Sequence, residues 1–235
     1  MFNPDAKFQA VSITQGDVCY VIDDALISPE NWLDYADAHR DQFATAPHNA
    51  YPGIELALPE RISTMLEVFF RLHIRRHLGA RRMLNMHSRL SMATLQPEAL
   101  SPIQWLCHRD RLGAPETQMA AASVLYLFDD PSLGGTSFYL PKQDRSDTEA
   151  LMRLAGNASR AEVLANTTIA PSYLLDSNDY FQRVCTVPAK WNRIIFYNGS
   201  LFHSPDLRHP AALSEDPRKG RLTLNSFYTC SRAAT

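Results

Sequence analysis

The sequence has few cysteines, and their arrangement suggests no structural role. Four cysteines occur in 235 residues, none of them in a C-x-x-C pair, at Cys19, Cys107, Cys185 and Cys230. Such scattered single cysteines argue against a disulfide framework and against a cysteine-rich zinc site. We therefore expect a protein of the reducing cytoplasm.

Long apolar runs and a strong excess of charge are also missing. No run approaches the roughly 20 residues that span a bilayer, and the start, MFNPDAKFQ, lacks the pattern of a signal peptide. The net charge of −2 gives no general attraction to nucleic acid or anionic membrane. The one basic cluster, RLHIRRHLGARR at 71–82, fits cations at a helix C-terminus. We expect no nucleic acid and no membrane as partner, and make no prediction of the oligomeric state.

The residues that are present suit one globular domain. Hydrophobic residues make up 45% of the chain and charged residues 20%, which is enough for a sizeable core. No repeat, low-complexity tract or linker divides the chain, so residues 1–235 are expected to form a single domain. Residues 1–80 predict a helical lead-in, with a strand at 18–26, a helix from Ser28 to about residue 42 and a strong helix over 59–78.

After residue 80 the pattern changes to short strand-like runs separated by turns rich in Pro, Gly and Asp. The runs cover 83–95, 120–128, 136–141, 183–189, 193–198 and 221–230. A helical stretch over 146–167 interrupts the series. Helices first and strands afterwards predict a mostly β fold with flanking helices: a double-stranded β-helix, the cupin-like jelly roll, over about 83–230, buttressed by the N-terminal helices.

Three residues distant in the chain form a candidate metal site. His108 and Asp110 are two positions apart, so an extended backbone directs both side chains to one face and Arg109 to the other. His203 follows 93 residues after the aspartate. Two imidazoles and one carboxylate form the facial triad of non-haem Fe(II) proteins. For an isolated H-x-D triplet, a loop histidine beside a surface aspartate is the simpler interpretation, so the surrounding sequence decides.

Three segments around these residues carry a pattern in a fixed order. They are ASVLYLFDDPSLGGTSFYLP (122–141), NRIIFYNGSLFHSP (192–205) and GRLTLNSFY (220–228). With the H-x-D triplet they resemble the 2-oxoglutarate- and Fe(II)-dependent dioxygenase superfamily, of the prolyl-hydroxylase-like kind, over roughly 83–230. Two departures are a longer spacing between the aspartate and the distal histidine, mostly due to 146–167, and a proline only two residues after that histidine.

The resemblance implies a role for each matching residue. His108, Asp110 and His203 would hold iron and form the catalytic centre. In the cosubstrate site, Arg221 would pair with the distal carboxylate of 2-oxoglutarate, and the hydroxyls of Thr223 and Tyr126 would bind the same group. The planar guanidinium of arginine matches a carboxylate and keeps its proton.

The implied activity is an oxidoreductase that consumes dioxygen and 2-oxoglutarate and hydroxylates an unactivated C–H bond. The substrate would be a small molecule or a peptide, and residues 43–58, expected to be irregular, could form a lid over the cosubstrate. Two alternatives stay open. A cupin-like metal-binding module without turnover would not need a keto-acid clamp. A zinc-dependent hydrolase on the same triad would need a general base, for which no extra carboxylate is clearly placed.

Overall fold

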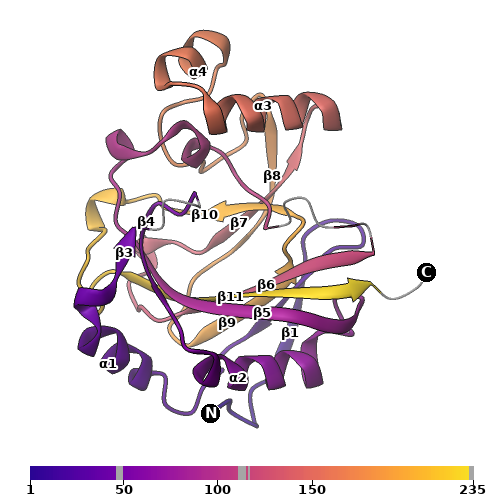
Figure 1. Ribbon diagram of the computed structural model, residues 1–235, viewed down its shortest axis with the longest axis vertical. Helices are drawn as coiled ribbons and strands as arrows, with labels where there is room; N and C mark the ends of the chain where they lie inside the picture. Colours follow the sequence, from indigo (N-terminus) through magenta and orange to yellow (C-terminus); the bar gives the residue numbers. More distant parts are fainter. Residues whose placement is uncertain (46–49, 111–114, 116, 233–235) are drawn as a thin grey trace.

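The described part of the chain folds mainly into β-structure. The computed structural model describes residues 1–45, 50–110, 115 and 117–232. Its strands form two antiparallel sheets, and four α-helices pack around them (Figure 1). The expected mostly β fold with flanking helices is confirmed.

The larger sheet has eight strands in the order β1-β2-β9-β6-β11-β5-β4-β3, with every neighbouring pair antiparallel. Its strands are β1 (Phe8–Ser12), β2 (Val18–Ile22), β3 (Ala44–Thr45), β4 (Gly53–Ala57), β5 (Ala80–Ala93), β6 (Gln118–Tyr126), β9 (Arg193–Asn198) and β11 (Arg221–Arg232). Strand β11 pairs along most of its length with β5 and β6. It is therefore the buried centre of the sheet.

The smaller sheet carries part of the candidate site. It consists of β7 (Thr136–Pro141), β8 (Phe181–Val187) and β10 (Phe202–Pro205) in the order β10-β7-β8. On the side of β10 away from β7, His108 forms an isolated antiparallel bridge with His203. The segment that holds the H-x-D triplet thus extends the edge of this sheet by a single β-bridge.

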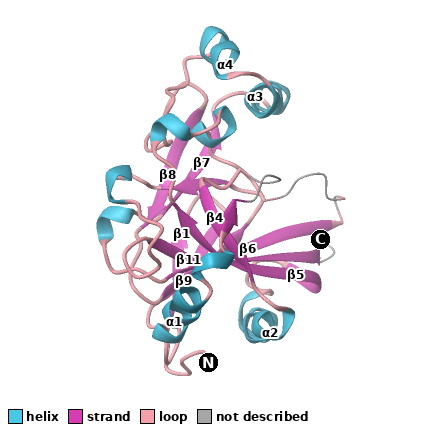
Figure 2. Cartoon of the chain, turned by 60° about the vertical axis from the view of Figure 1, so that its left-hand side comes forward, coloured by secondary structure: helices cyan, strands magenta, loops and turns pink. Residues whose placement is uncertain are grey.

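Two helices cover one face of the larger sheet. Helices α1 (Glu30–Ala38) and α2 (Glu60–Phe69) lie below it in Figure 2. At the end of α2, the ring of Phe70 stacks on Tyr228 of β11 with centroids 3.8 Å apart. This face therefore holds the main apolar core, and the opposite face of the sheet is left for the space between the sheets.

The face that each residue of β11 occupies follows from strand alternation. Leu222, Leu224 and Tyr228 belong to the core under the helices, whereas Phe227 packs against the inter-sheet cluster. Thr223 and Asn225, which share the parity of Phe227, face the space between the sheets. Polar residues are uncommon at buried positions, so their presence here indicates that the space between the sheets does more than pack the two sheets together.

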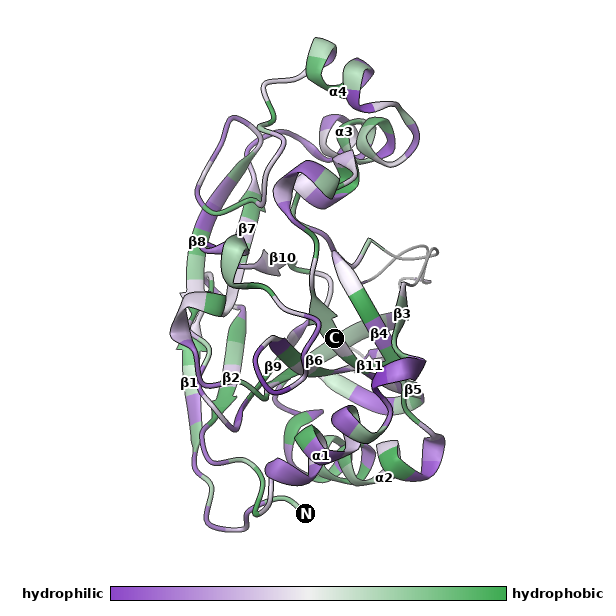
Figure 3. Cartoon of the chain, turned by 90° about the vertical axis from the view of Figure 1, so that its left-hand side faces the viewer, coloured by the Kyte–Doolittle hydropathy of each residue, from purple (hydrophilic) through white to green (hydrophobic). Residues whose placement is uncertain are grey.

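The predicted helical stretch over 146–167 is confirmed, but it forms two helices. Helix α3 (Arg145–Asn157) is followed by α4 (Arg160–Asn166), which begins at a capping box between Ser159 and Glu162. Both helices lie at the end of the molecule opposite the N-terminus (Figure 3). No helix in the described ranges is long and apolar enough to cross a bilayer.

Several boundaries in the lead-in differ from expectation. The first 80 residues supply strands β1 to β4 to the large sheet, so the lead-in is not mainly helical. Residues 53–57, expected to be irregular, form β4, because Gly53 lets the chain run against Met92 of β5: a Cβ there would lie 2.0 Å from the Met92 carbonyl oxygen. The predicted helix over 59–78 is regular only to Phe69; a wider turn follows to Ile74, and Gly79, with φ +73°, ends the segment.

Candidate metal and cosubstrate site

The backbone brings the first two candidate ligands to the distal histidine. The N–H of His108 donates to the carbonyl of His203 and the N–H of His203 donates back, both at 2.9 Å. The N–H of Asp110 donates to the carbonyl of Gly199 at 2.8 Å. Main-chain hydrogen bonds therefore join two pairs of residues, His108 with His203 and Asp110 with Gly199, that lie about ninety positions apart in the chain. Arg109 points away, as predicted, and lies over the ring of Phe202.

The three predicted ligands converge. Nε2 of His108 lies 3.7 Å from Oδ1 of Asp110, and Nε2 of His203 lies 3.7 Å from Oδ2 of the same carboxylate. One ligand atom from each residue falls within 4.8 Å of the others. The side chains of Asp110 and His203 are 8% and 6% exposed, whereas that of His108 is 45% exposed. The cluster is thus enclosed on one side and reachable from the side of His108.

The tautomer of His203 is set by its own turn. Nδ1 of the ring lies 2.9 Å from the carbonyl oxygen of Leu201, so Nδ1 carries the proton and donates it there. Nε2 then has a lone pair directed at the carboxylate side of the cluster. Tyr197 packs edge-on against the imidazole with centroids 4.8 Å apart and limits its rotation. Such a fixed ring is the usual arrangement of a metal-ligating histidine.

Burial favours the neutral form of each ligand. Desolvation lowers the pKa of His203 to about 4. The pKa of His108 is lowered as well, by desolvation and by the neighbouring His203. Desolvation raises the pKa of Asp110, and His108 opposes that rise. Both imidazoles therefore offer lone pairs at neutral pH.

The residues fit a divalent metal by an observation independent of their spacing. Oδ2 of Asp110 is buried and has no hydrogen-bond partner among the described residues. A buried carboxylate oxygen without a donor is costly. A cation between the two Nε2 atoms and this oxygen would supply the missing interaction. The donor set of two imidazoles and one carboxylate suits Fe(II) or a similar divalent metal.

Gly199 shapes the site, although it was not among the residues predicted to form it. A Cβ at this position would lie 2.9 Å from Oδ2 and 3.1 Å from Cβ of Asp110. The glycine therefore makes room for the carboxylate while its carbonyl holds the aspartate backbone. The N-G-S turn just before the distal histidine was the available signal. Within the same turn, Oδ1 of Asn198 accepts from the N–H of Ser200, so this asparagine stabilises the turn.

Arg221, predicted to bind the cosubstrate, is 3% exposed at the start of β11. Its Nε donates to the carbonyl of Leu133 and its Nη2 to the carbonyl of Gly135, both at 2.9 Å. No described carboxylate lies within ion-pair distance of the guanidinium. It therefore anchors the double-glycine turn and brings a charge without a counter-ion into the protein.

Thr223 and Tyr126 lie beside this arginine. They are directly paired across β11 and β6. The Tyr126 hydroxyl is 2.8 Å from that of Thr136, and the Thr223 hydroxyl donates to the Ser91 carbonyl at 3.3 Å. Burial raises the pKa of Tyr126, and the charge of Arg221 is among the effects that oppose the rise. The structure thus brings the three predicted cosubstrate residues into one neighbourhood.

Two further features surround this neighbourhood and were not predicted as part of the site. Tyr51 is half-buried with its hydroxyl inside the protein; burial raises the pKa of this phenol, and the charge of Arg221 opposes that rise. It belongs to the segment that was considered as a lid; residues 46–49 of that segment lie outside the described residues. Glu55 and Arg89 form an ion pair with 2.8 Å between Nε and Oε1.

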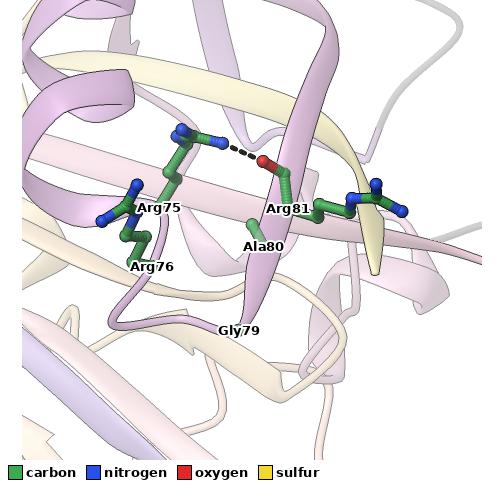
Figure 4. A pocket seen from close by; sticks show the side chains of 5 residues that line it. All are labelled: Arg75, Arg76, Gly79, Ala80 and Arg81. Carbon is green, nitrogen blue, oxygen red and sulfur yellow. Dashed lines mark hydrogen bonds between the residues drawn. The ribbon is translucent and has the colours of Figure 1, made fainter. Parts of the chain in front are cut away.

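The basic cluster of the sequence lies elsewhere, at the turn from α2 to β5. Figure 4 shows a shallow hollow lined by Arg75, Arg76, Gly79, Ala80 and Arg81. Arg75 donates to the carbonyls of Arg71 and Arg81 and so ties the helix end to the strand. None of the triad residues lines this hollow.

Solved structures with a similar fold include non-heme alpha-ketoglutarate-dependent enzymes and a protein solved with 2-oxoglutarate bound. The non-heme alpha-ketoglutarate-dependent carbocyclase SnoK from nogalamycin biosynthesis aligns with a TM-score of 0.50 at 16% identity, over 93% of this chain and 81% of its own. HygX from Streptomyces hygroscopicus, solved with nickel and 2-oxoglutarate bound, gives 0.50 at 12% identity, over 91% and 82%. A prolyl-4-hydroxylase from Pseudomonas putida gives 0.46 at 14% identity, over 92% and 93%.

At these identities the likeness to SnoK and HygX establishes the fold alone. No curated protein matches the sequence significantly. A family model described as "Family of unknown function (DUF6445)" matches residues 4–228, nearly the whole chain, and the chain therefore belongs to this family.

Proposed function

We propose that the protein is a non-haem Fe(II)- and 2-oxoglutarate-dependent oxygenase that hydroxylates an unactivated C–H bond. Its substrate would be a small molecule or a peptide, and its place of action the cytoplasm. The observation that carries the proposal is that a three-residue metal cluster and the buried guanidinium of Arg221, which has no ion-pair partner among the described residues, both lie in the space between the sheets.

The strand order supports a double-stranded β-helix. Along the chain, β5 lies in the large sheet, the His108 segment in the small one, β6 in the large, β7 and β8 in the small, β9 in the large, β10 in the small and β11 in the large. Four strands of the large sheet then face four of the small sheet, as in a jelly roll. In this arrangement His108 and His203 occupy neighbouring strands at the sheet edge.

In the proposed enzyme, the two Nε2 atoms of His108 and His203 and a carboxylate oxygen of Asp110 would hold the iron. The bound iron and keto acid would supply the oxidation with dioxygen, which converts 2-oxoglutarate to succinate and carbon dioxide. The chain supplies position: the Leu201 carbonyl fixes the His203 ring, and the Gly199 carbonyl fixes Asp110. The surrounding aromatic core keeps water from the buried side of the cluster.

The cosubstrate assignment rests on a contrast between two arginines that approach the inter-sheet space. Arg89 is neutralised by Glu55 at 2.8 Å. Arg221 is nearly fully buried, and its hydrogen-bond partners in the described part of the chain are main-chain carbonyls. An uncompensated buried cation is expensive, and the distal carboxylate of 2-oxoglutarate would complete its environment. Tyr197 packs on His203. Burial and the charge of Asp110 raise the pKa of this phenol, and the charge of Arg221 opposes the rise. Both charges therefore act on the same side chain, which supports placing Asp110 and Arg221 around one space.

An anaerobic titration tests this proposal. Fe(II) is added to the purified protein, then 2-oxoglutarate, while the weak visible charge-transfer absorption of an iron-chelated keto acid is followed. We expect the band to saturate at one equivalent of each and to be absent in Asp110→Asn. Iron binding without the band would favour a metal-binding module, and exclusive zinc binding with hydrolytic turnover would favour a hydrolase. Either result would overturn the oxygenase proposal.

A further inference from the structure

Asn225 of β11 presents a buried oxygen to the space between the sheets. The residue is 8% exposed, and its Oδ1 has no hydrogen-bond partner in the described part of the chain. Leaving such a buried acceptor unpaired destabilises the protein. An unpaired acceptor in the central strand of the sheet points to a ligand that brings the missing donor.

The position of Asn225 follows from strand register. Across the sheet it pairs with Arg89 of β5 and Val124 of β6. Two residues earlier on β11, Thr223 pairs with Tyr126, beside Arg221. The opposite direction along β6 leads to Ala120, whose carbonyl accepts from the N–H of Gly199, the residue that holds Asp110. Asn225 therefore lies between the proposed cosubstrate anchor and the level of the metal cluster.

The surface next to Asn225 is aromatic and close to neutral. Phe227, two residues along the same face, stacks with His87 at 4.9 Å and an interplanar angle of 19°. The guanidinium of Arg89 lies 4.6 Å from the centre of the same ring, and Glu55 balances its charge. This wall would accept a flat or apolar body and offers no free charge to attract an ionic one.

We propose that Asn225 is a substrate-binding residue: its Oδ1 accepts a hydrogen bond from a neutral N–H or O–H group, as in an amide or an alcohol. The inference rests on the proposed oxygenase function, whose substrate it describes. The cosubstrate cannot take this role, because 2-oxoglutarate at neutral pH carries only acceptors. An ammonium donor would lie beside the guanidinium of Arg89, the direct cross-strand neighbour of Asn225. The substrate is accordingly a neutral amide or alcohol with a body that rests on Phe227.

The test follows the side-chain amide signals of Asn225 by ¹⁵N NMR, assigned by their loss in Asn225→Asp. The probes are N-methylacetamide, N,N-dimethylacetamide, 1-propanol and methylammonium, added to the protein with and without Zn(II) and 2-oxoglutarate. We expect N-methylacetamide or 1-propanol to shift the signals saturably, and the two to separate an amide from an alcohol preference. N,N-dimethylacetamide, which has the same carbonyl and no donor, should cause no saturable shift, and neither should methylammonium.

A pair of variants isolates the oxygen. Asn225→Leu should bind the responding probe at least about tenfold more weakly, followed through the ring signals of His87, and should remain folded because it removes an unpaired polar group. Asn157→Leu, at an exposed position on α3, is the matched control and should bind like the parent protein. Equal affinity in Asn225→Leu and the parent, or an equal response to both amides, would overturn the proposal.

The result separates this inference from the oxygenase proposal. If 2-oxoglutarate alone shifts the Asn225 signals and displaces the probe, Asn225 belongs to the cosubstrate site and the inference is wrong while the oxygenase remains. If the probe binds through Asn225 but the charge-transfer band never forms, the binding site stands and the oxygenase proposal fails. That outcome would overturn the description of the ligand as an oxygenase substrate.

Discussion

At the scale of single residues, the candidate site consists of polar groups that are buried away from water and lack a full set of partners among the described residues. Among the described residues, Oδ2 of Asp110 has no hydrogen-bond donor, and Arg221, which donates to main-chain carbonyls, has no carboxylate within ion-pair distance. Elsewhere the same residue types are satisfied: Asp23 is held by Arg193 at 2.6 Å. The difference marks the groups that are available to ligands, and it gives the ligand-free protein specific weaknesses.

The first prediction concerns stability without metal. Asp110→Asn removes a buried, unpaired charge and keeps its shape, so the free energy of unfolding in the presence of a chelator should rise by about 1–3 kcal/mol. Asp23→Asn, which breaks the pair with Arg193, should lower it. Urea unfolding at pH 7 measures both. A loss of stability in Asp110→Asn would show that the carboxylate is already satisfied in the metal-free protein.

The second prediction concerns pH. His203 has a pKa of about 4 in the folded protein and about 6.5 when unfolded. Between these values the unfolded chain binds more protons, so the metal-free protein should lose stability as the pH falls from about 6.5 to 4, by about 3.4 kcal/mol at most. His203→Gln should lose less over the same range. Urea unfolding curves at several pH values test this, and identical slopes for both proteins would contradict it.

The third prediction separates the two roles of Arg221, as an anchor of main-chain carbonyls and as an anion-binding group. Arg221→Lys should weaken 2-oxoglutarate binding by roughly 10- to 100-fold, because a planar charged contact is worth about 1.5–3 kcal/mol. Arg160→Lys is the matched control: Arg160 donates to the carbonyls of Glu98 and Leu100, outside the inter-sheet space. Isothermal calorimetry compares the two. Similar affinities would refute the clamp.

At the scale of elements, sequence patterns predicted the strands that alternate clearly and missed those defined by their partners. The segments of β5, β6, β9 and β11 were expected from apolar alternation. Strand β4 was missed because Glu55 occupies an inward position, where its partner is Arg89. The metal triad could be predicted because i, i+2 spacing puts His108 and Asp110 on one face and because the surrounding segments resemble a known superfamily, which implied His203 as the third ligand. The contribution of Gly199 could not, since it depends on contact with a segment ninety residues away.

The fourth prediction uses that glycine. Gly199→Ala would place a methyl group 2.9 Å from Oδ2 of Asp110, so the carboxylate must move and Fe(II) affinity should fall at least about tenfold. Gly156→Ala, in helix α3 with no heavy atom within 4 Å of the new Cβ, should leave metal binding unchanged and stabilise the helix by about 0.5–1 kcal/mol. Metal titration and thermal unfolding measure both. Undiminished iron affinity in Gly199→Ala would show that the carboxylate position is not critical.

At the scale of the whole molecule, the helices at the two ends of the fold pack on different parts of it. Helices α1 and α2 stabilise the large sheet from outside, and α3 with α4 packs on the loop that leads to His108, where Arg160 lies 5.0 Å from the ring centre of Trp105. The pairing of strands far apart in the sequence decides this arrangement. Local patterns do not encode such pairings, which is why the sequence predicted the class of fold and not the strand order.

The fifth prediction is an order of hydrogen exchange. Amides of β11, which is paired on both sides and mostly buried, should exchange only through global unfolding. Amides of α4, where Val163 is the one buried residue, should exchange through local opening, at least about a hundredfold faster. Mass spectrometry of exchanged peptides measures both. Equal protection of the two segments would mean that the insert unfolds together with the sheets.

The reciprocal main-chain bonds between His108 and His203 have a consequence for how such a centre can be lost. Because both imidazoles stand on facing rungs, sliding the two segments by a single position would replace His203 by Phe202 or Ser204 and invert the side on which His108 emerges. Metal capacity would then vanish in one step, with every ligand still in the chain. Iron uptake is thereby a direct report of correct strand alignment.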